Sequence, residues 1–208
     1  MPERRRRHPF YLFMGALLKP PMWSVYRMKV TGFEHVPKRG GFVLASNHFS
    51  NVDPFVLAYP FFPRRPLRFM AKSELYSPLL TPLLNAAGAF PVRRGEADID
   101  AFRTAVRLVK EGEIVAVFPQ GHRQPTDEME LREAQIHSGA VRIALAAKAP
   151  IVPAAVRGTD RLSKLGPFAS AYGPADTMED LRSLPSRKAA DIASKRVMQT
   201  IYELYATL

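Results

Sequence analysis

The sequence FVLASNHFSNVDP at residues 42–54 combines an apolar run, a polar turn and the start of a helix. Residues 42–46 form a short apolar stretch that is typical of a buried strand. Asp53 followed by Pro54 matches a helix N-cap with proline at the first helical position, and Ser50, three residues before Asp53, matches a capping box. A strand that leads through a short turn into a helix is the repeating unit of α/β proteins.

The same alternation of strand and helix patterns extends along the chain. Short apolar runs predict strands at residues 27–31, 42–46, 67–71, 89–92, 114–118, 151–156 and 168–172. Helical patterns lie at residues 54–59, 73–86, 97–111, 138–147 and 186–206. In the third of these, apolar residues recur at helical spacing from Ile99 to Val109 and predict a face that packs on a sheet. We therefore expect an α/β protein with a mixed, largely parallel sheet covered by helices.

Composition limits the class of protein and its partners. A chain of 208 residues with 47% hydrophobic residues fits one domain with a full core. The absence of cysteine excludes disulfides, a thiolate nucleophile and cysteine-bound metal. A net charge of +11 favours partners that are polyanions, phosphate-bearing small molecules or anionic membrane surfaces.

The N-terminal 27 residues have a composition of their own. Arginines at residues 4–7 precede an apolar run at residues 9–18, which Lys19, Pro20 and Pro21 are expected to break. A spanning helix needs roughly 20 apolar residues, so this run is too short to cross a bilayer. Aromatic residues beside arginines predict a helical segment, residues 1–27, that associates with an anionic membrane surface. A terminal helix that packs on the core is the alternative, and a signal peptide is disfavoured because no small-residue cleavage site follows.

His48 and Asp53 form the pair with the clearest chemical meaning. Histidine can accept a proton at physiological pH, and a carboxylate on its other ring nitrogen would fix the tautomer and stabilise the imidazolium. Five helical steps bring the two residues within about 7.5 Å, whereas five extended residues would separate them by roughly 17 Å. Helix capping explains these residues about as well as catalysis does, so both interpretations remain open at this point.

Three further motifs follow predicted strands, where open α/β sheets bind their ligands. Arg93 and Arg94 enter a turn after residues 89–92, and guanidinium groups suit phosphate oxygens, although paired surface arginines are more often simply solvated. A second motif, VFPQGHR at residues 117–123, comes at the end of a predicted strand and contains a flexible glycine and a cation. This composition fits an anion-binding site, and it also fits a plain turn. Residues 149–158 are consistent with a buried strand punctuated by prolines.

In this order the four motifs resemble those of the glycerolipid acyltransferase family, whose best-known member acylates 1-acylglycerol-3-phosphate. The resemblance runs from about residue 28 to residue 172. The family block Asn-His-x-Ser-x-x-Asp corresponds to Asn47, His48, Ser50 and Asp53. The block Phe-Pro-Val-Arg-Arg corresponds to residues 90–94, and the block Phe-Pro-Glu-Gly-Thr-Arg is matched at Phe118, Pro119, Gly121 and Arg123.

The resemblance implies an acyltransferase domain at residues 28–208. Such an enzyme passes an acyl chain from a thioester, acyl-CoA or acyl carrier protein, to the free hydroxyl of 1-acylglycerol-3-phosphate and gives phosphatidic acid, with no cofactor or metal. His48 would take the hydroxyl proton while Asp53 orients the ring. The residues implied to bind the substrate phosphate are Arg93, Arg94, Gln120, Gly121 and Arg123, and the supporting residues are Asn47, Ser50 and His122. The expected location is peripheral, on the cytoplasmic face of the membrane.

Two positions depart from the family pattern in the third block. Gln120 stands where the family has glutamate, and His122 stands where it has threonine. Neither substitution is expected to touch the His48–Asp53 pair. Because the third block is implied to bind the acceptor, a different lysolipid acceptor is an alternative. His122 fits a phosphate contact or a plain loop residue equally well.

Proteins of other classes remain as rivals. The basic charge and the arginine-rich start also suit a nucleic-acid-binding protein, but the aromatic residues lie within apolar runs instead of alternating with basic residues, so no nucleic acid is expected. A non-catalytic lipid-binding member of the same fold is the other rival. The sequence contains no Gly-x-Ser-x-Gly elbow, no Walker loop and no spaced metal-ligand cluster.

Overall fold

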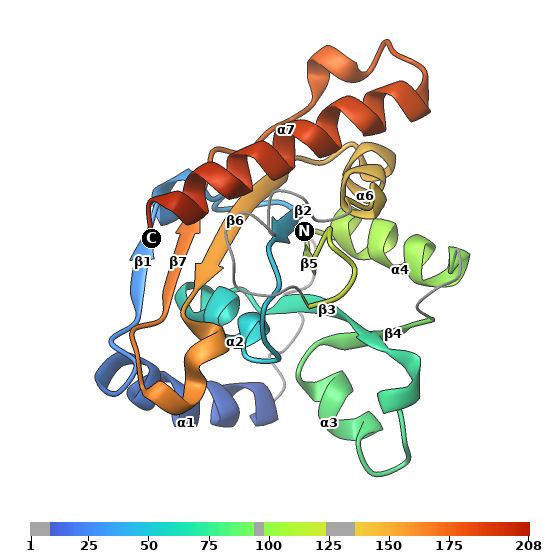
Figure 1. Cartoon of the computed structure of the whole chain (residues 1–208). Helices are drawn as coiled ribbons and strands as arrows, with labels where there is room; N and C mark the ends of the chain where they lie inside the picture. The colour runs from blue at the N-terminus through green and yellow to red at the C-terminus, as the bar shows by residue number, and fades with distance from the viewer. Residues whose placement is uncertain (1–8, 94–97, 124–135) are drawn as a thin grey trace.

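The computed structural model describes residues 9–93, 98–123 and 136–208, and its centre is a seven-stranded sheet (Figure 1). The strands are β1 (Lys29–Thr31), β2 (Phe42–Ser46), β3 (Leu67–Lys72), β4 (Ala89–Val92), β5 (Ile114–Val117), β6 (Ile151–Arg157) and β7 (Ala169–Tyr172). Their order is β1-β7-β6-β2-β5-β3-β4, and every neighbouring pair is parallel except β6 and β7. The predicted mixed, largely parallel sheet is confirmed, with every predicted strand present.

Helices cover both faces of the sheet. They are α1 (Pro9–Ser24), α2 (Asp53–Ala58), α3 (Thr81–Ala86), α4 (Ile99–Lys110), α6 (Gly139–Ala147) and α7 (Ser186–Ala206). Apolar side chains of α4, α6 and α7 share one core cluster, and those of α1 and α2 share the other. In the part of the chain that the structure describes, no helix is long and apolar enough to cross a membrane.

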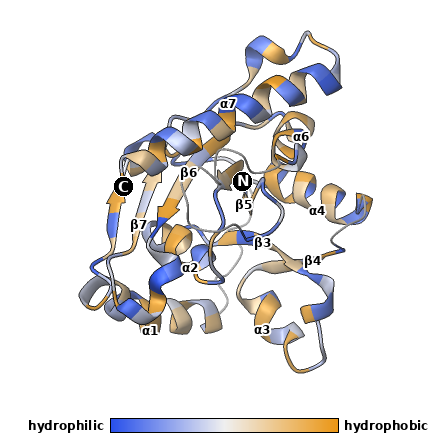
Figure 2. Ribbon diagram, in the orientation of Figure 1, coloured by the Kyte–Doolittle hydropathy of each residue, from blue (hydrophilic) through white to orange (hydrophobic). Residues whose placement is uncertain are grey.

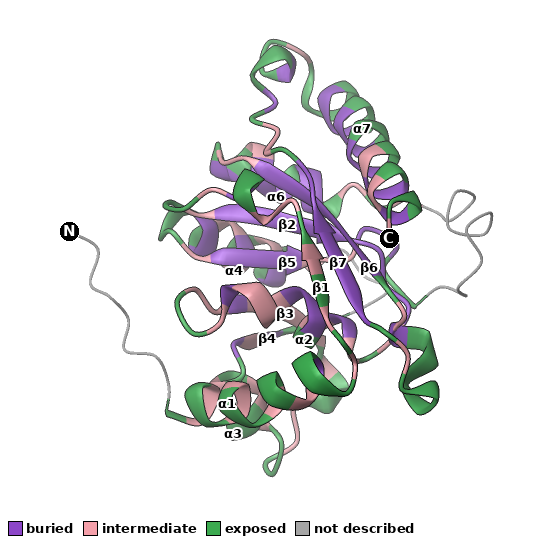
Figure 3. Ribbon diagram, turned by 90° about the vertical axis from the view of Figure 1, so that its left-hand side faces the viewer, coloured by how far each residue is buried: buried purple, intermediate pink, exposed green. Residues whose placement is uncertain are grey.

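Strand β2 lies between these two clusters and is buried along its whole length, as the purple strands of Figure 3 show. Because side chains alternate along a strand, Phe42 and Leu44 pack on the side of α2, and Val43 and Ala45 pack on the side of α4, α6 and α7. Its parallel neighbours β5 and β6 supply the backbone partners on either edge. The residues that follow β2 are therefore held by a rigid, fully covered strand.

The sheet brings the predicted motifs to one edge. Strands β2, β3, β4, β5 and β6 all run in the same direction, so their carboxyl ends meet at the same edge of the sheet. The residues after β2 lie beside those after β5 and β6. Strand β4 is three strands away from β2 in the order, which at about 4.8 Å per strand is about 14 Å.

Three predicted helices differ from those observed. The predicted helix at residues 73–86 is interrupted, because a proline at position 78 disfavours helical backbone at Ser77, and only α3 at its end is α-helical. The helix near the N-terminus was expected to break at Pro20 and Pro21, but α1 continues through both to Ser24. Ile99 was predicted to lie on the side of the third helix that packs on the sheet, but in α4 it is 59% exposed. The buried side of this helix faces α6 as well as the sheet.

Candidate active site

The turn between β2 and α2 is built around one carboxylate oxygen. Oδ2 of Asp53 accepts hydrogen bonds from Nδ1 of His48 at 2.7 Å, from the backbone N–H of Phe49 at 2.7 Å and from that of Ser50 at 2.8 Å. The side chain of Asp53 is completely buried. Because α2 begins at Asp53, the chain must turn back at this point, and the turn closes the five-residue gap between the histidine and the carboxylate.

The geometry shows histidine positioning but only part of a capping box, and the N-cap residue of α2, Val52, makes no side-chain capping bond. The bond from the Ser50 N–H to Asp53 is one half of a capping box, but Oγ of Ser50 accepts from the Val52 N–H at 3.3 Å, so the reciprocal half is missing. The same carboxylate oxygen also accepts a hydrogen bond from the N–H at Nδ1 of His48. In a neutral imidazole this arrangement leaves Nε2 as the unprotonated nitrogen, which can accept a proton.

The third block holds His48 directly. The imidazole stacks on the ring of Phe118 with centroids 4.0 Å apart and planes 15° apart. The backbone N–H of His48 donates to Oε1 of Gln120 at 2.9 Å. Because the N–H can only donate, the end of the Gln120 amide that faces it must be the oxygen. Nε2 of Gln120 is buried without a hydrogen-bond partner among the described residues. Strand β5 lies beside β2, so the residues after it support the catalytic turn from one side.

This contact corrects two expectations about Gln120. The side chain is 0% exposed, so it does not lie on a surface where it could meet a phosphate. It was also expected to leave the His48–Asp53 pair untouched, whereas it accepts a hydrogen bond from the backbone of His48. Sequence spacing does not reveal this contact, because it depends on the adjacency of β2 and β5 in the sheet.

The side chain of Asn47 forms hydrogen bonds between the same turn and β6. Its Nδ2 donates to the carbonyl of Val156 at 2.9 Å, and its Oδ1 accepts from the N–H of Val156 at 2.9 Å. The carboxamide therefore pairs with a β6 residue as a neighbouring strand would, and it is completely buried. The fourth motif, which contains Val156, supports the turn from the side opposite β5.

The described residues predicted to bind phosphate come from two segments, one after β5 and one after β4. Gly121, His122 and Arg123 are exposed and follow β5 directly, next to the His48 turn. Arg93 follows β4, about 14 Å of sheet away from β2, and its side chain is 63% exposed. Arg94 lies outside the described residues.

The backbone of Arg93 is fixed by the start of α4. Asp98 accepts hydrogen bonds from the N–H groups of Ala101 and Arg93 at 3.0 and 2.9 Å, and these bonds lower the pKa of the Asp98 carboxyl. The Arg93 guanidinium lies 3.6 Å from the same carboxylate. Part of its positive charge is therefore already balanced by Asp98.

His137 is a site residue that the sequence did not predict. Its backbone N–H donates to the carbonyl of Pro119 at 2.8 Å, and its ring lies against Gly121. A Cβ on Gly121 would lie 2.9 Å from Cδ2 of His137, and φ is +73° there, so only glycine fits. The contact joins residues 119–121 to a residue more than ten positions later, so no local sequence pattern indicates it.

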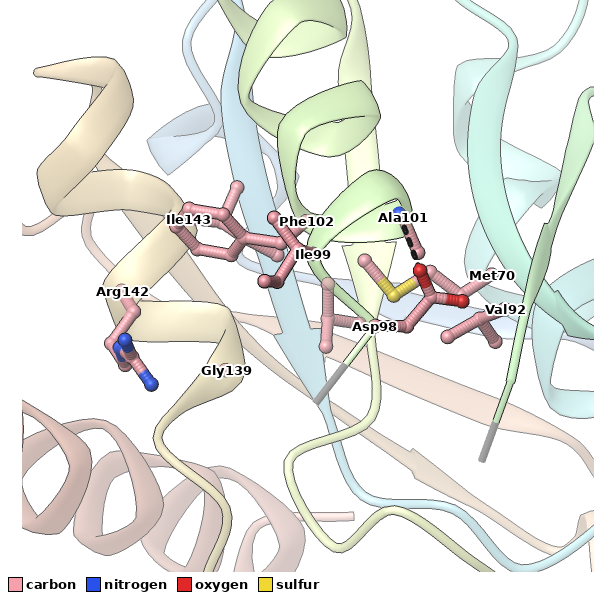
Figure 4. A pocket seen from close by; sticks show the side chains of 10 residues that line it. Met70, Val92, Asp98, Ile99, Ala101, Phe102, Gly139, Arg142 and Ile143 are labelled. Carbon is pink, nitrogen blue, oxygen red and sulfur yellow. Dashed lines mark hydrogen bonds between the residues drawn. The ribbon is translucent and has the colours of Figure 1, made fainter. Parts of the chain in front are cut away.

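An apolar pocket of about 270 Å³ opens beside the third block (Figure 4). It is lined by Met70, Val92, Asp98, Ile99, Ala101, Phe102, Val117, Gly139, Arg142 and Ile143. The pocket lies between the starts of α4 and α6 and at the carboxyl ends of β4 and β5. Val117 in its wall directly precedes Phe118, which stacks on His48.

Comparison of the sequence with known proteins identifies the family to which this fold and its buried His–Asp pair belong. The family model described as Acyltransferase matches residues 27–157, so the chain belongs to the acyltransferase family. A 1-acyl-sn-glycerol-3-phosphate acyltransferase of Bacillus subtilis is 34% identical over 198 residues, which cover 93% of this chain and 96% of that protein. This relationship places the chain with the 1-acyl-sn-glycerol-3-phosphate acyltransferases and makes it an O-acyltransferase.

Two further relatives are more distant. A 1-acyl-sn-glycerol-3-phosphate acyltransferase of Borreliella burgdorferi is 25% identical over 154 residues, which cover 72% of this chain and 59% of that protein. The crystal structure of the 1-acyl-sn-glycerophosphate acyltransferase PlsC from Thermotoga maritima superposes with a TM-score of 0.59 and 23% identity. The superposition covers 92% of this chain and 87% of that chain, and it supports the fold.

The Gln120→Met substitution tests the support of His48. Methionine has similar length but cannot accept the His48 N–H, so we expect the free energy of unfolding to fall by about 1–3 kcal/mol. Urea denaturation measures this change. The matched control Gln199→Met replaces an exposed glutamine on α7 and should stay within about 0.5 kcal/mol of the wild type. Equal stability of the Gln120→Met variant and the wild type would contradict the role of this hydrogen bond.

Proposed function

We propose that this enzyme acylates the free hydroxyl of 1-acylglycerol-3-phosphate and so produces phosphatidic acid for phospholipid synthesis. The observation that carries the proposal is the 2.7 Å hydrogen bond from Nδ1 of His48 to a buried Asp53, which leaves Nε2 as a base at the edge of the sheet. The names of the relatives support the choice of acceptor. Acyl-CoA or acyl carrier protein would be the donor and co-substrate, with no further cofactor.

The proposed reaction is a direct transfer. Nε2 of His48 takes the proton of the acceptor hydroxyl as its oxygen attacks the thioester carbonyl carbon. The carbon–sulfur bond then breaks, and the imidazolium returns the proton to the departing thiolate. Asp53 keeps the ring in the required tautomer and stabilises the imidazolium during the transfer. The stacked ring of Phe118 holds the imidazole, and the bond from the His48 backbone N–H to Gln120 holds the backbone, which makes Gln120 a positioning residue.

The phosphate of the acceptor would be bound by the exposed part of the third block. Gly121, His122 and Arg123 follow β5, the strand next to β2, so this loop is the nearest of the predicted phosphate-binding groups to His48. Arg93, which follows β4 farther along the same edge, remains part of the proposal as a phosphate-binding cation, and so does Arg94, which lies outside the described residues. Binding of the phosphate would hold the acceptor hydroxyl at the base. The apolar pocket beside Val117 is the candidate site for an acyl chain.

A peripheral position on the cytoplasmic face of the membrane completes the proposal. Helix α1 buries only Met22 among its described side chains, and it exposes Phe13, Leu17 and Trp23. With 16 residues α1 is too short to span a bilayer by itself, so its exposed aromatic and aliphatic side chains would place it in the interface. The lipid nature of both acceptor and product supports this location.

The His48→Ala substitution tests the base. We expect kcat to fall by about 10²–10⁴-fold, because no other group replaces Nε2 as proton acceptor. An acyl-transfer assay with acyl-CoA and 1-acylglycerol-3-phosphate measures it, and the urea midpoint shows whether the fold is kept. The control His122→Ala removes an exposed histidine of the third block and should keep kcat, with a raised KM at most. Turnover by His48→Ala at the wild-type rate would refute the assignment.

A panel of lysolipid acceptors tests the substrate. The wild type should show its highest kcat/KM with 1-acylglycerol-3-phosphate, since this acceptor presents a phosphomonoester to the Arg123 loop, whereas choline and ethanolamine lysolipids carry a phosphodiester. The Gln120→Glu variant should keep the same order of acceptors, because this side chain faces His48 and not the phosphate. A preference of the wild type for a choline or ethanolamine lysolipid would show that another acceptor is the substrate. Each acceptor is tested with both acyl-CoA and acyl carrier protein donors.

A further inference from the structure

The connection between β3 and β4 exposes leucines to an unusual degree. Residues 75–92 contain no charged side chain. Within this stretch Leu79 is 86% exposed, and Leu75, Leu80 and Leu83 are 40–47% exposed. We refer to these four residues as the leucine surface. Soluble proteins scatter single exposed leucines, but a cluster in one short segment indicates an interaction site.

Helix α3, which carries part of this surface, has no buried residue. It packs on β4, and Leu80 and Leu83 stay 40% and 43% exposed. Figure 2 shows that much of α3 is hydrophobic. An apolar helix with no covering layer exposes to water the surface that would normally be buried. The leucine surface is therefore an unpartnered apolar face within the described structure.

The leucine surface lies at the same end of the molecule as α1. Figures 1 and 3, which are related by a turn about the vertical axis, both place α3 and α1 at the lower end. Helix α1 exposes Phe13, Leu17 and Trp23 there, at 56–71%. Leu75 follows the carboxyl end of β3, so the leucine surface begins at the sheet edge that carries His48.

The charges around both segments favour an anionic partner. Neither α1 nor residues 75–92 contain an aspartate or glutamate, and the chain as a whole carries a net charge of +11. Lys72 and Arg93, on either side of residues 75–92, are each paired with a carboxylate, Glu74 at 3.2 Å and Asp98 at 3.6 Å, so the attraction to anionic lipid comes from the net positive charge of the chain. Apolar side chains on a chain of net positive charge suit the interface of a bilayer with anionic lipids.

We propose that the leucine surface is a second membrane contact, which inserts into an anionic phospholipid bilayer together with α1. The choice of a bilayer as the partner rests on the proposed function, because the acceptor of that reaction is a lipid. One contact would leave the enzyme free to rotate on the membrane, whereas two separated contacts fix its orientation. The carboxyl edge of the sheet, with His48, then faces the lipid from which the acceptor comes.

The double variant Leu79→Gln/Leu83→Gln of the full chain tests the proposal by flotation with vesicles. Vesicles of phosphatidylcholine and phosphatidylglycerol are compared with vesicles of phosphatidylcholine alone. Loss of an inserted leucine weakens binding by about tenfold, so the double variant should bind the anionic vesicles at least tenfold more weakly than the wild type. Leu75→Gln, outside α3, gives an independent variant that should also bind more weakly.

The matched control is Ile192→Gln, which removes a 37% exposed apolar side chain from α7, on the face of the sheet opposite α1. It should bind vesicles as the wild type does. Wild-type binding by both leucine variants would overturn the proposal. The proposal would also be overturned if the double variant binds vesicles normally but changes from dimer to monomer in sedimentation, since the surface would then join two copies of the chain.

The vesicle-binding result for the leucine surface can be distinguished from a failure of the proposed function. With a short-chain, monomerically soluble 1-acylglycerol-3-phosphate, the double variant should keep the kcat of the wild type, because His48 and its support are untouched. Absence of transfer by the wild type with every acceptor would refute the proposed function, while the flotation result would still decide the leucine surface. A double variant that loses vesicle binding and keeps soluble-substrate turnover supports both.

Discussion

The structure of the site depends on the three hydrogen bonds that Oδ2 of Asp53 accepts. Two of them come from backbone N–H groups, so the same atom that binds the imidazole also closes the turn after β2 and starts α2. In a completely buried place these bonds are not weakened by water. Closure of the turn and orientation of the imidazole are therefore two consequences of one interaction.

The neighbouring strands make this arrangement rigid. Gln120 and Phe118, after β5, hold the backbone and the ring of His48, and Asn47 pairs with Val156 of β6. The third block thus divides into a buried part that positions the base and an exposed part, from Gly121 onward, that is available to substrate. At position 120 an amide oxygen accepts the His48 N–H, as a carboxylate oxygen of the family's glutamate could, so the substitution preserves the hydrogen bond to the turn.

The sequence predicted the elements better than the contacts between them. Periodicity located all the strands because buried strands are short apolar runs, and the capping residues marked the start of α2 at Asp53. It failed at residues 73–86, where the proline at position 78 outweighed apolar spacing. The pairing of His48 with Asp53 follows from local geometry and was predictable, whereas the Gln120 contact and the distance to Arg93 depend on strand order, which no local pattern encodes.

Catalysis by His48 requires that Asp53 holds the ring with its proton on Nδ1 and leaves Nε2 free as the base. Nitrogen NMR of the protein labelled in its histidine rings, at a pH where His48 is neutral, reports this directly. We expect Nδ1 of His48 to resonate as a protonated nitrogen and Nε2 as an unprotonated one. A ring protonated on Nε2, or an even mixture of the two tautomers, would contradict it.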